Sequence, residues 1–445
     1  MVEPREPQTT IGFVDEYCKT YQNLFSDVRT YEYFKFLHVG MISELPRKSL
    51  PEIARIVGLK DGQGLHHLLR DAVWDVKAFQ QMRLQLTLVT IGSQPITLCI
   101  DETGDKKKGW ATDYVAKQYI GNLGKVENGI VSVNAYAVID NMTYPLMFKV
   151  FKPRQRLKPG DQYKTKPQLA LEIIQELVDY GFNIELVLAD SLYGESTELV
   201  LALSELKLPF IVSIRSNHVV WLSPKQRVRY NRWCAYEQSL SHRLAETRYI
   251  REIIFGKRRE LRYFEITKDN TNPESADTWF IMTNLSGKIQ QTLGNLYSLR
   301  TWIEYGFKQV KEQLGWADFR LTDYNSIERW WETVFSAYFL VGLQALQFKS
   351  SATDSEVTTN LSTNSYSNKT NNSKEISQHP KWEPGNNWKS SLNNLRLIIL
   401  PYIFWYLVEP WLRVYRIPEL KRGLFQLIGI LNNFRGCSID YAMAS

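Results

Sequence analysis

The sequence ITLCIDETG, residues 96–104, is a short apolar run that leads into Asp101, and VLADSLYG, residues 187–194, repeats the arrangement at Asp190. A short apolar run bounded by turn residues is typical of a strand buried in a sheet. If the two strands are parallel neighbours, both aspartates emerge at the same edge of the sheet. Two carboxylates this close repel each other unless cations lie between them, so the pair predicts a site for divalent metal ions.

A single aspartate at the end of a strand also has an ordinary explanation, as a helix cap or a turn former. The case for a catalytic pair therefore depends on the order of the surrounding elements. Strands are expected at 96–100, 130–139, 144–151, 184–189 and 210–214, and helices at 167–180 and 197–206. Right-handed crossovers would lay the later strands parallel beside the first, which gives an α/β fold.

A third carboxylate lies in the segment YSLRTWIEYGFKQVK, residues 297–311. A single helix is expected from 289 to 314. Its period places one set of side chains on one face: Tyr297, Arg300, Glu304, Lys308 and Lys311. Ion pairs on an exposed helix would explain the same charges without any chemistry, so the two upstream aspartates decide between the two interpretations.

The two aspartates and the Tyr-x2-Arg-x3-Glu-x6-Lys spacing resemble the YREK branch of the DDE transposases of bacterial insertion sequences. The helical N-terminal block and the runs DETGDKKKG and DSLYG are similar to its insertion-sequence 701 family. The resemblance spans residues 11–348. It implies an α/β fold that has a ribonuclease-H-like catalytic core with a β-rich insertion domain, a helical N-terminal DNA-binding domain and a helical C-terminal tail.

The resemblance also implies the chemistry of the site. Asp101, Asp190 and Glu304 would be the catalytic residues and would hold two Mg2+ or Mn2+ ions per active site. One ion would activate the attacking water or 3′-hydroxyl, and the other would stabilise the leaving oxygen. The expected products are transposon ends cut from flanking DNA and joined to target DNA.

Further residues are implied as contacts to DNA. Tyr297, Arg300 and Lys311 match family positions that contact phosphates near the cleaved end, and Lys308 lies beside them. Trp279 stands where some members carry a tryptophan that stacks on a flipped base. A core aromatic of the last inserted strand explains Trp279 equally well.

The charge of the chain is concentrated in one segment. The whole chain has 54 Lys and Arg against 47 Asp and Glu, a formal charge of +7. Residues 215–266 hold twelve basic and five acidic residues, which also gives +7, and aromatic residues are interleaved among them. This segment, in which Arg258 and Arg259 are the named candidates, is expected to track DNA phosphates, although a solvated charged face is the usual explanation of such a run.

The pattern divides the chain into six parts. They are a helical N-terminal DNA-binding domain (1–94), the first part of the catalytic core (95–217), a β-rich insertion domain (218–285), the helical second part of the core (286–348), a flexible polar linker (349–388) and a helical C-terminal region (389–445). Gly58-Leu59 resembles the turn of a helix-turn-helix, but a plain helical hairpin explains it as well. The four cysteines lie far apart and fit neither a zinc site nor a disulfide framework.

The expected partners are transposon-end DNA and target DNA, and a homodimer is expected in the DNA complex because two ends must be paired. The most apolar run, Leu397–Val408, is about 12 residues long and contains Pro401, which is too short to span a bilayer. No membrane partner is therefore expected, and the predicted location is cytoplasmic and nucleoid-associated. Two alternatives stay open: a ribonuclease-H-fold DNA endonuclease without strand transfer, and a domesticated DNA-binding descendant.

Overall fold

The computed structural model describes residues 5–140, 142–240, 243–257, 260–273, 277–357, 376–385 and 387–434. The chain divides into two compact units. One unit is Ser93–Phe307, and the other joins the residues up to Gly92 to the residues from Lys308 onward. The second of these, called the helical unit below, contains both the predicted N-terminal domain and the predicted C-terminal region.

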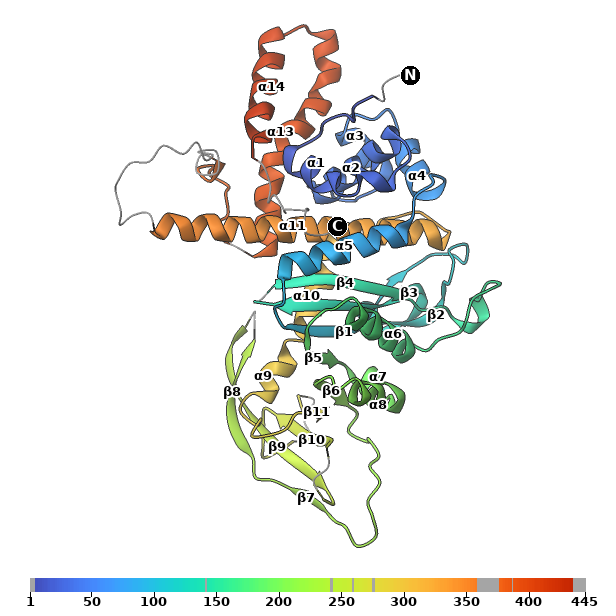
Figure 1. The fold of residues 1–445 in the computed structure, drawn as a ribbon, viewed down its shortest axis with the longest axis vertical. Helices are drawn as coiled ribbons and strands as arrows, with labels where there is room; N and C mark the ends of the chain where they lie inside the picture. The colour runs from blue at the N-terminus through green and yellow to red at the C-terminus, as the bar shows by residue number, and fades with distance from the viewer. Residues whose placement is uncertain are drawn as a thin grey trace. The chain divides into compact units, whose positions relative to one another are not determined.

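Within Ser93–Phe307, eleven strands of the described residues form one mixed sheet (Figure 1). They are β1 Ile96–Lys106, β2 Ala116–Ile120, β3 Lys125–Ile139, β4 Met142–Val150, β5 Ile184–Ala189, β6 Phe210–Ile214, β7 Val228–Tyr230, β8 Cys234–Leu240, β9 Arg243–Phe255, β10 Arg262–Thr267 and β11 Trp279–Thr283. The strand order is β2-β3-β1-β5-β6-β11-β10-β9-β7, with β4 on β3 and β8 on β9. The fold is therefore mixed α/β, as the sequence predicts.

The centre of the sheet has the predicted parallel arrangement. Strand β5 is parallel to β1, with Ala189 opposite Ile100, and β6 is parallel to β5. Strand β1 does not stop at Asp101, as predicted, but continues to Lys106. The strand continues because β3 pairs with it from Thr97 to Lys106. This pairing gives hydrogen-bond partners to the backbone of residues 102–106, whose side chains are too polar to predict a buried strand.

The β-rich segment predicted as an insertion domain lies in this same sheet. Strand β11 pairs with β6, placing Phe280 opposite Ile214, and β10, β9 and β7 follow in order. The inserted strands thus extend the central sheet instead of forming a separate one, because the free edge of β6 offers unpaired backbone groups to β11.

Five α-helices of the described part of the chain accompany the sheet. They are α6 Lys166–Asp179, α7 Ser191–Gly194, α8 Thr197–Glu205, α9 Leu293–Ser298 and α10 Thr301–Lys308, with 3-10 turns at Gly121–Leu123 and Arg154–Arg156. Helix α6 begins at a capping box between Thr165 and Gln168, and its apolar face, which includes Ile173 and Leu177, packs on β3 and β4. The helices predicted at 167–180 and 197–206 are confirmed by α6 and α8.

The single helix predicted from 289 to 314 is wrong. Residues Leu299 and Arg300 separate α9 from α10. Around this break four amides bond to carbonyls three residues back, those of Leu299, Arg300, Trp302 and Ile303. A five-residue π-helical turn, Gln309–Gln313, then follows α10. Tightening to three residues per turn changes which side chains share a face, so the spacing of a regular helix does not apply across this segment.

The helical unit is built around one long helix. Its helices are α1 Gly12–Lys19, α2 Val28–Ile42, α3 Leu50–Ile56, α4 Gln63–Arg70, α5 Val76–Ile91, α11 Tyr324–Val357, α13 Trp388–Val414 and α14 Pro418–Asn432, with a 3-10 turn at Gln22–Leu24. Helix α11 packs against α2, α4, α5 and α13. Its buried Trp331 stacks on Trp316 at 4.5 Å between ring centroids.

Helix α11 also corrects the predicted linker. It continues to Val357, so the first nine residues of the predicted stretch 349–388 are helical. At the other end, Trp388 begins α13 and stacks on Tyr338 at 4.4 Å between ring centroids. Residues 358–375, the middle of the predicted linker, lie outside the described residues.

Helix α13 is longer than the apolar run that the sequence suggested. It spans Trp388–Val414 and includes Pro401 and Pro410, so neither proline ends it. Among the described residues, α13 is the helix whose length and composition would allow it to cross a membrane. Its first half, however, packs in the helical unit, with Leu392, Leu395 and Ile399 buried.

Candidate active site

Asp101 and Asp190 lie side by side at the edge of the sheet where the parallel pairing of β1 with β5 ends. Ile100 of β1 lies opposite Ala189 of the parallel strand β5, and the two aspartates are the next residues along the chain. Asp190 also caps the short helix α7, since its Oδ1 accepts a hydrogen bond of 2.9 Å from the Leu192 amide. The ordinary role of a helix cap is thus present alongside the pairing.

The electrostatics of the two aspartates show that they are crowded. Burial, with a smaller contribution from Asp190, raises the pKa of Asp101 to about 7, although Arg300 opposes the shift. Burial and the nearby Glu102 likewise raise the pKa of Asp190. Removal from water and like charge both disfavour ionised carboxylates, so this edge of the sheet favours an added positive charge.

Arg300 joins the first and third predicted acids. Its Nη1 donates to Asp101 Oδ2 at 2.8 Å, and its Nη2 donates to Glu304 Oε1 at 3.2 Å. The Arg300 side chain is 21% exposed and that of Glu304 59%. The structure therefore brings Asp101, Arg300 and Glu304 into one ion-pair chain, with Asp190 beside it.

Sequence reasoning missed Glu102. Its side chain accepts hydrogen bonds from Lys166 Nζ at 2.9 Å and from Tyr193 OH at 3.1 Å. These contacts tie the strand that carries Asp101 to helix α7, which begins after Asp190. The signal was present, since Glu102 directly follows Asp101 and Tyr193 lies three residues after Asp190, but the link between them needs the parallel pairing.

A pocket of about 480 Å3 opens next to Asp190. Ser213, Trp279, Tyr297 and Arg300 line it together with Asp190. The guanidinium of Arg248 lies 4.1 Å from the centre of the Trp279 ring, and Tyr297 meets the same ring edge-on at 5.9 Å. Trp279 thus has both features that the sequence left open, a packed environment and a wall of a pocket.

The remaining predicted phosphate contacts are dispersed. Tyr297 is buried in α9. Lys308 ends α10 and Lys311 lies in the π-helical turn, and both belong to the helical unit. Arg258 and Arg259 lie outside the described residues.

Part of the basic segment is engaged within its own sheet. Ion pairs join Arg248 to Glu246 at 2.7 Å, Arg251 to Glu265 at 2.6 Å, and Arg262 to Glu252 at 3.0 Å. Arg251 also lies over the rings of Tyr230 and Trp233, 4.6 and 4.2 Å from their centres. Among the side chains of the segment that the structure describes, the exposed cations are Arg215, Lys225, Arg227, Arg229, Arg232 and Lys257. Charge counted along the sequence therefore overstates the charge that this segment offers to a ligand.

The donor set at the edge of the sheet fits a hard divalent cation. Asp101 and Asp190 offer only carboxylate oxygens, the ligands that Mg2+ and Mn2+ prefer. Glu304 is held by Arg300 instead. Within the described ranges, no group of three or more His, Cys, Asp or Glu side chains is arranged around one point. The aspartate pair thus fits such an ion, and the third acid is joined to the pair through an arginine.

Comparison with known proteins defines the class. The family of DDE superfamily endonucleases matches residues 21–243, half of the chain. The chain is therefore a DNA-cleaving enzyme of the DDE type, and enzymes of this superfamily generally use divalent metal ions.

A narrower assignment follows from one relative. The probable transposase for insertion sequence element IS701 from Microchaete diplosiphon is 54% identical over 329 residues, which cover 74% of this chain and 87% of that protein. The chain belongs to the IS701 family of DDE transposases. The resemblance drawn from the sequence motifs is confirmed.

Proposed function

We propose that this transposase cuts transposon ends from flanking DNA and joins their 3′-hydroxyl groups to target DNA. The observation that carries the proposal is the position of Asp101 on β1 and of Asp190 directly after the parallel strand β5, with Arg300 joining Asp101 to Glu304. Family membership supplies the reaction class, and this edge of the sheet supplies acids on separate elements that can act on one phosphodiester.

Asp101, Asp190 and Glu304 are the residues that would hold divalent cations, two Mg2+ or Mn2+ ions per site. Such ions polarise a phosphoryl oxygen and lower the pKa of a bound water. The protein's own contribution would be to hold the acids in position. Glu102 does so through its hydrogen bonds from Lys166 and Tyr193, and Arg300 does so through its ion pair with Asp101.

Arg300 has a second role in this proposal. Without cations it neutralises Asp101 and Glu304, and its planar fork of donors also matches a phosphate group. In the presence of DNA, the same donors of Arg300 would suit contact with a backbone phosphate near Asp101 and Glu304. Tyr297 and Trp279, which line the adjacent pocket, would hold a base or sugar displaced from the duplex.

The remaining DNA contacts are proposed from charge and position in the chain. Exposed cations between Arg215 and Lys257, with Arg258 and Arg259, Lys308 and Lys311, would track phosphates. The N-terminal helices would recognise transposon ends, two chains would act together on paired ends, and the enzyme would associate with the nucleoid.

A strand-transfer assay tests the proposed function. The full chain is incubated with Mg2+, duplexes carrying the ends that flank its coding region, and a supercoiled target plasmid. We expect joined products, with the 3′-ends of the duplex covalently attached to the plasmid, and no products in EDTA. Cleaved ends without joining would favour an endonuclease, and end binding without cleavage under any divalent cation would favour a DNA-binding descendant.

The raised pKa of Asp101 predicts how metal binding depends on pH. Between about pH 4 and 7 the folded chain holds a proton on Asp101 that the unfolded chain has lost, so the metal-free protein loses stability as pH rises through this window. A cation must displace that proton, so Mg2+ or Mn2+ should bind more tightly at pH 8 than at pH 5.5.

Thermal unfolding measures this effect. Millimolar Mn2+ is expected to raise the melting temperature more at pH 8 than at pH 5.5, because bound ligand stabilises the folded state. In Asp101→Asn the pH dependence of the shift should largely disappear. Equal shifts of the parent at both pH values would contradict the assignment.

A further inference from the structure

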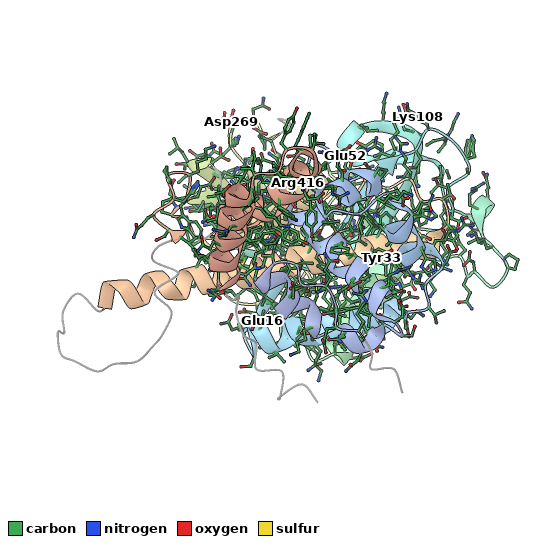
Figure 2. All side chains as sticks on the ribbon, turned by 90° about the horizontal axis from the view of Figure 1, so that it is seen from above. Glu16, Tyr33, Glu52, Lys108, Asp269 and Arg416 are labelled. Carbon is green, nitrogen blue, oxygen red and sulfur yellow. The ribbon has the colours of Figure 1, made fainter. Side chains whose placement is uncertain are left out.

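Helices α13 and α14 form a two-helix hairpin whose far half has few contacts within the helical unit. Figure 1 shows the two helices side by side, antiparallel, beyond the N-terminal helices. Arg416, labelled in Figure 2, lies in the turn between them. Trp405 of α13 packs on Phe425 of α14 at 4.7 Å between ring centroids, which closes the inner side of the hairpin.

The outer side of α13 carries an exposed apolar stripe. Its members are Leu400, Phe404, Leu407, Trp411 and Val414, each between 40% and 69% exposed. They are spaced four, three, four and three residues apart, the spacing that faces a partner helix along a coiled-coil seam. A lone exposed apolar residue is unremarkable on any protein, but a continuous stripe at this spacing indicates a surface for another helix.

Helix α14 continues the apolar surface. Leu420, Leu427 and Ile430 are exposed by 43% to 51%. Leu427 and Ile430 also line an apolar groove of about 430 Å3 together with Leu400 and Pro401 of α13. The stripe on α13 and the exposed face of α14 thus meet at this groove.

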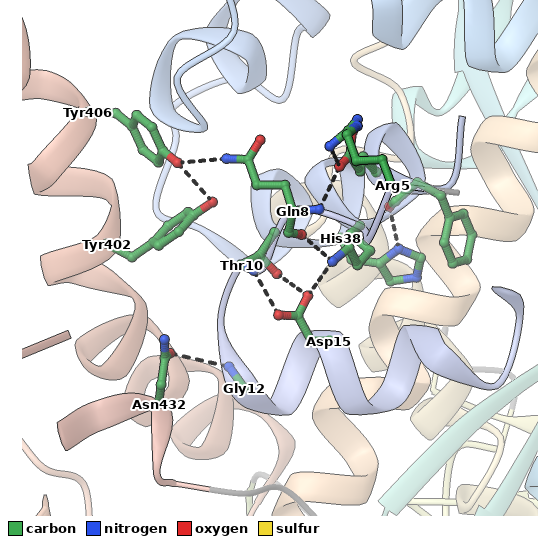
Figure 3. Close-up of polar contacts among 12 residues, drawn as sticks. Arg5, Gln8, Thr10, Gly12, Asp15, His38, Tyr402, Tyr406 and Asn432 are labelled. Carbon is green, nitrogen blue, oxygen red and sulfur yellow. Dashed lines mark hydrogen bonds and ion pairs between the residues drawn. The ribbon is translucent and has the colours of Figure 1, made fainter. Parts of the chain in front are cut away.

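The base of the hairpin is fixed to the N-terminal segment, as Figure 3 shows. Gln8 Nε2 donates to Tyr406 OH at 3.2 Å, and the Gly12 amide donates to Asn432 Oδ1 at 3.3 Å. Gly58, in the turn between α3 and α4, has a φ of +75°, and a Cβ there would lie 2.1 Å from the Tyr406 ring. The hairpin therefore presents its apolar face from a fixed position within the helical unit.

A lipid bilayer does not match this surface. The first half of α13 is held in the protein and includes buried polar residues, among them Ser390, Ser391 and Asn394. The part beyond Tyr402 that carries most of the stripe runs from 403 to 414, which is about 18 Å of helix at ~1.5 Å per residue. The hydrocarbon core of a membrane is about 30 Å thick.

We infer that the hairpin of α13 and α14 is the surface through which two copies of this chain pair. The stripe residues of both helices together expose on the order of 700 Å2 of apolar surface, taking about 150–250 Å2 for a large side chain. Each partner in a stable interface contributes about 800 Å2. The charged residues beside the stripe are of both signs, so acidic and basic side chains of two identical hairpins can face each other; they are Glu409, Arg413, Arg416, Glu419, Lys421 and Arg422.

The pairing of two chains would bring two active sites to two transposon ends, and this purpose rests on the proposed function. The evidence for the pairing is the hairpin itself. The pairing is therefore expected without DNA and without metal, and it can be measured where catalysis plays no part.

Sedimentation of the full chain at micromolar concentration, without DNA, tests the inference. We expect the parent to have the mass of a dimer, and the double variant Leu407→Glu, Trp411→Glu to have the mass of a monomer with the helix content of the parent by circular dichroism. Both side chains are at least 40% exposed, so the charges meet water in the monomer. Weakening by a hundredfold or more is expected, because each buried charge in an apolar seam costs several kcal/mol.

Two controls make the result specific. Arg413→Ala changes an exposed residue of the same helix off the stripe, and Val73→Glu adds a charge at another exposed apolar position of the helical unit. Both should remain dimeric. A monomeric parent, a dimeric double variant, or monomeric controls would overturn the inference, as would a monomeric parent that co-sediments with phosphatidylcholine or phosphatidylglycerol vesicles. Failure of strand transfer with an intact dimer would count against the proposed function alone.

Discussion

Asp101→Asn, Asp190→Asn and Glu304→Gln are each expected to lower Mg2+-dependent cleavage of transposon-end duplexes about a thousandfold or more. Each change replaces a carboxylate by a neutral amide of almost the same shape. A bound cation supplies several kcal/mol of charge stabilisation in the transition state, and each 1.36 kcal/mol lost is tenfold in rate. The measurement is single-turnover cleavage under saturating Mg2+, with end binding followed in parallel.

The direction of the stability change separates a catalytic effect from misfolding. At neutral pH burial holds the pKa of Asp101 near 7, so removal of its charge should leave the melting temperature equal or higher. The matched control is Asp179→Asn, the same change at an exposed position of α6. Cleavage at the parent rate by any of the three variants would show that its acid is not part of the site.

The second large effect concerns the core of the helical unit. Glu332→Ala is expected to lower the free energy of unfolding by about 3–5 kcal/mol. Arg83 and Glu332 are fully buried and form an ion pair of 3.0 Å, and Gln80 donates to the other carboxylate oxygen. Loss of Glu332 would remove the buried carboxylate that balances the guanidinium charge of Arg83, and a buried charge without its counter-charge is costly.

Replacement of both partners should behave differently. The double variant Arg83→Met, Glu332→Leu removes both charges and fills the space, so it should be far more stable than Glu332→Ala and close to the parent. Glu52→Ala, which breaks the exposed pair with Arg55, is the control and should cost less than about 1 kcal/mol. Urea unfolding followed by tryptophan fluorescence measures all three. Equal losses in the single and double variants would show that packing, not charge, sets the effect.

The strands of the central sheet were predictable because their information is local. Ile184–Ala189 and Phe210–Ile214 are apolar runs bounded by turn residues, and the structure gives both the same bounds. Strand β1 beyond Asp101 was not predictable, since Glu102 to Lys106 are mostly polar and form a strand only because β3 lies beside them. The pairing of β1 with β3, which lies further along the chain, therefore determines the strand conformation of residues 102–106, and their own strand propensity does not predict it.

The same distinction separates the predicted and missed parts of the site. The aspartate pair followed from two apolar runs that each lead into an aspartate, and in the structure these runs lie in parallel neighbouring strands. The break between α9 and α10 did not follow, because the shift to bonds three residues back accompanies the burial of Tyr297 in tertiary contacts. The Glu102 contacts were missed because Lys166 lies 64 residues further along the chain.

The assembly of the helical unit from both ends of the chain sets an order in time. Arg83 precedes its partner Glu332 by 249 residues, and the whole strand-rich unit is encoded between them. At about 5–20 residues per second, the ribosome takes roughly ten to fifty seconds to synthesise the residues between Arg83 and Glu332. During this time the N-terminal helices lack α11, the long helix that completes their core. The N-terminal helices, which are proposed to recognise DNA, are therefore synthesised first but complete their packing last. A chain that ends before α11 would contain Asp101, Asp190 and Glu304 but would lack the packed helical unit.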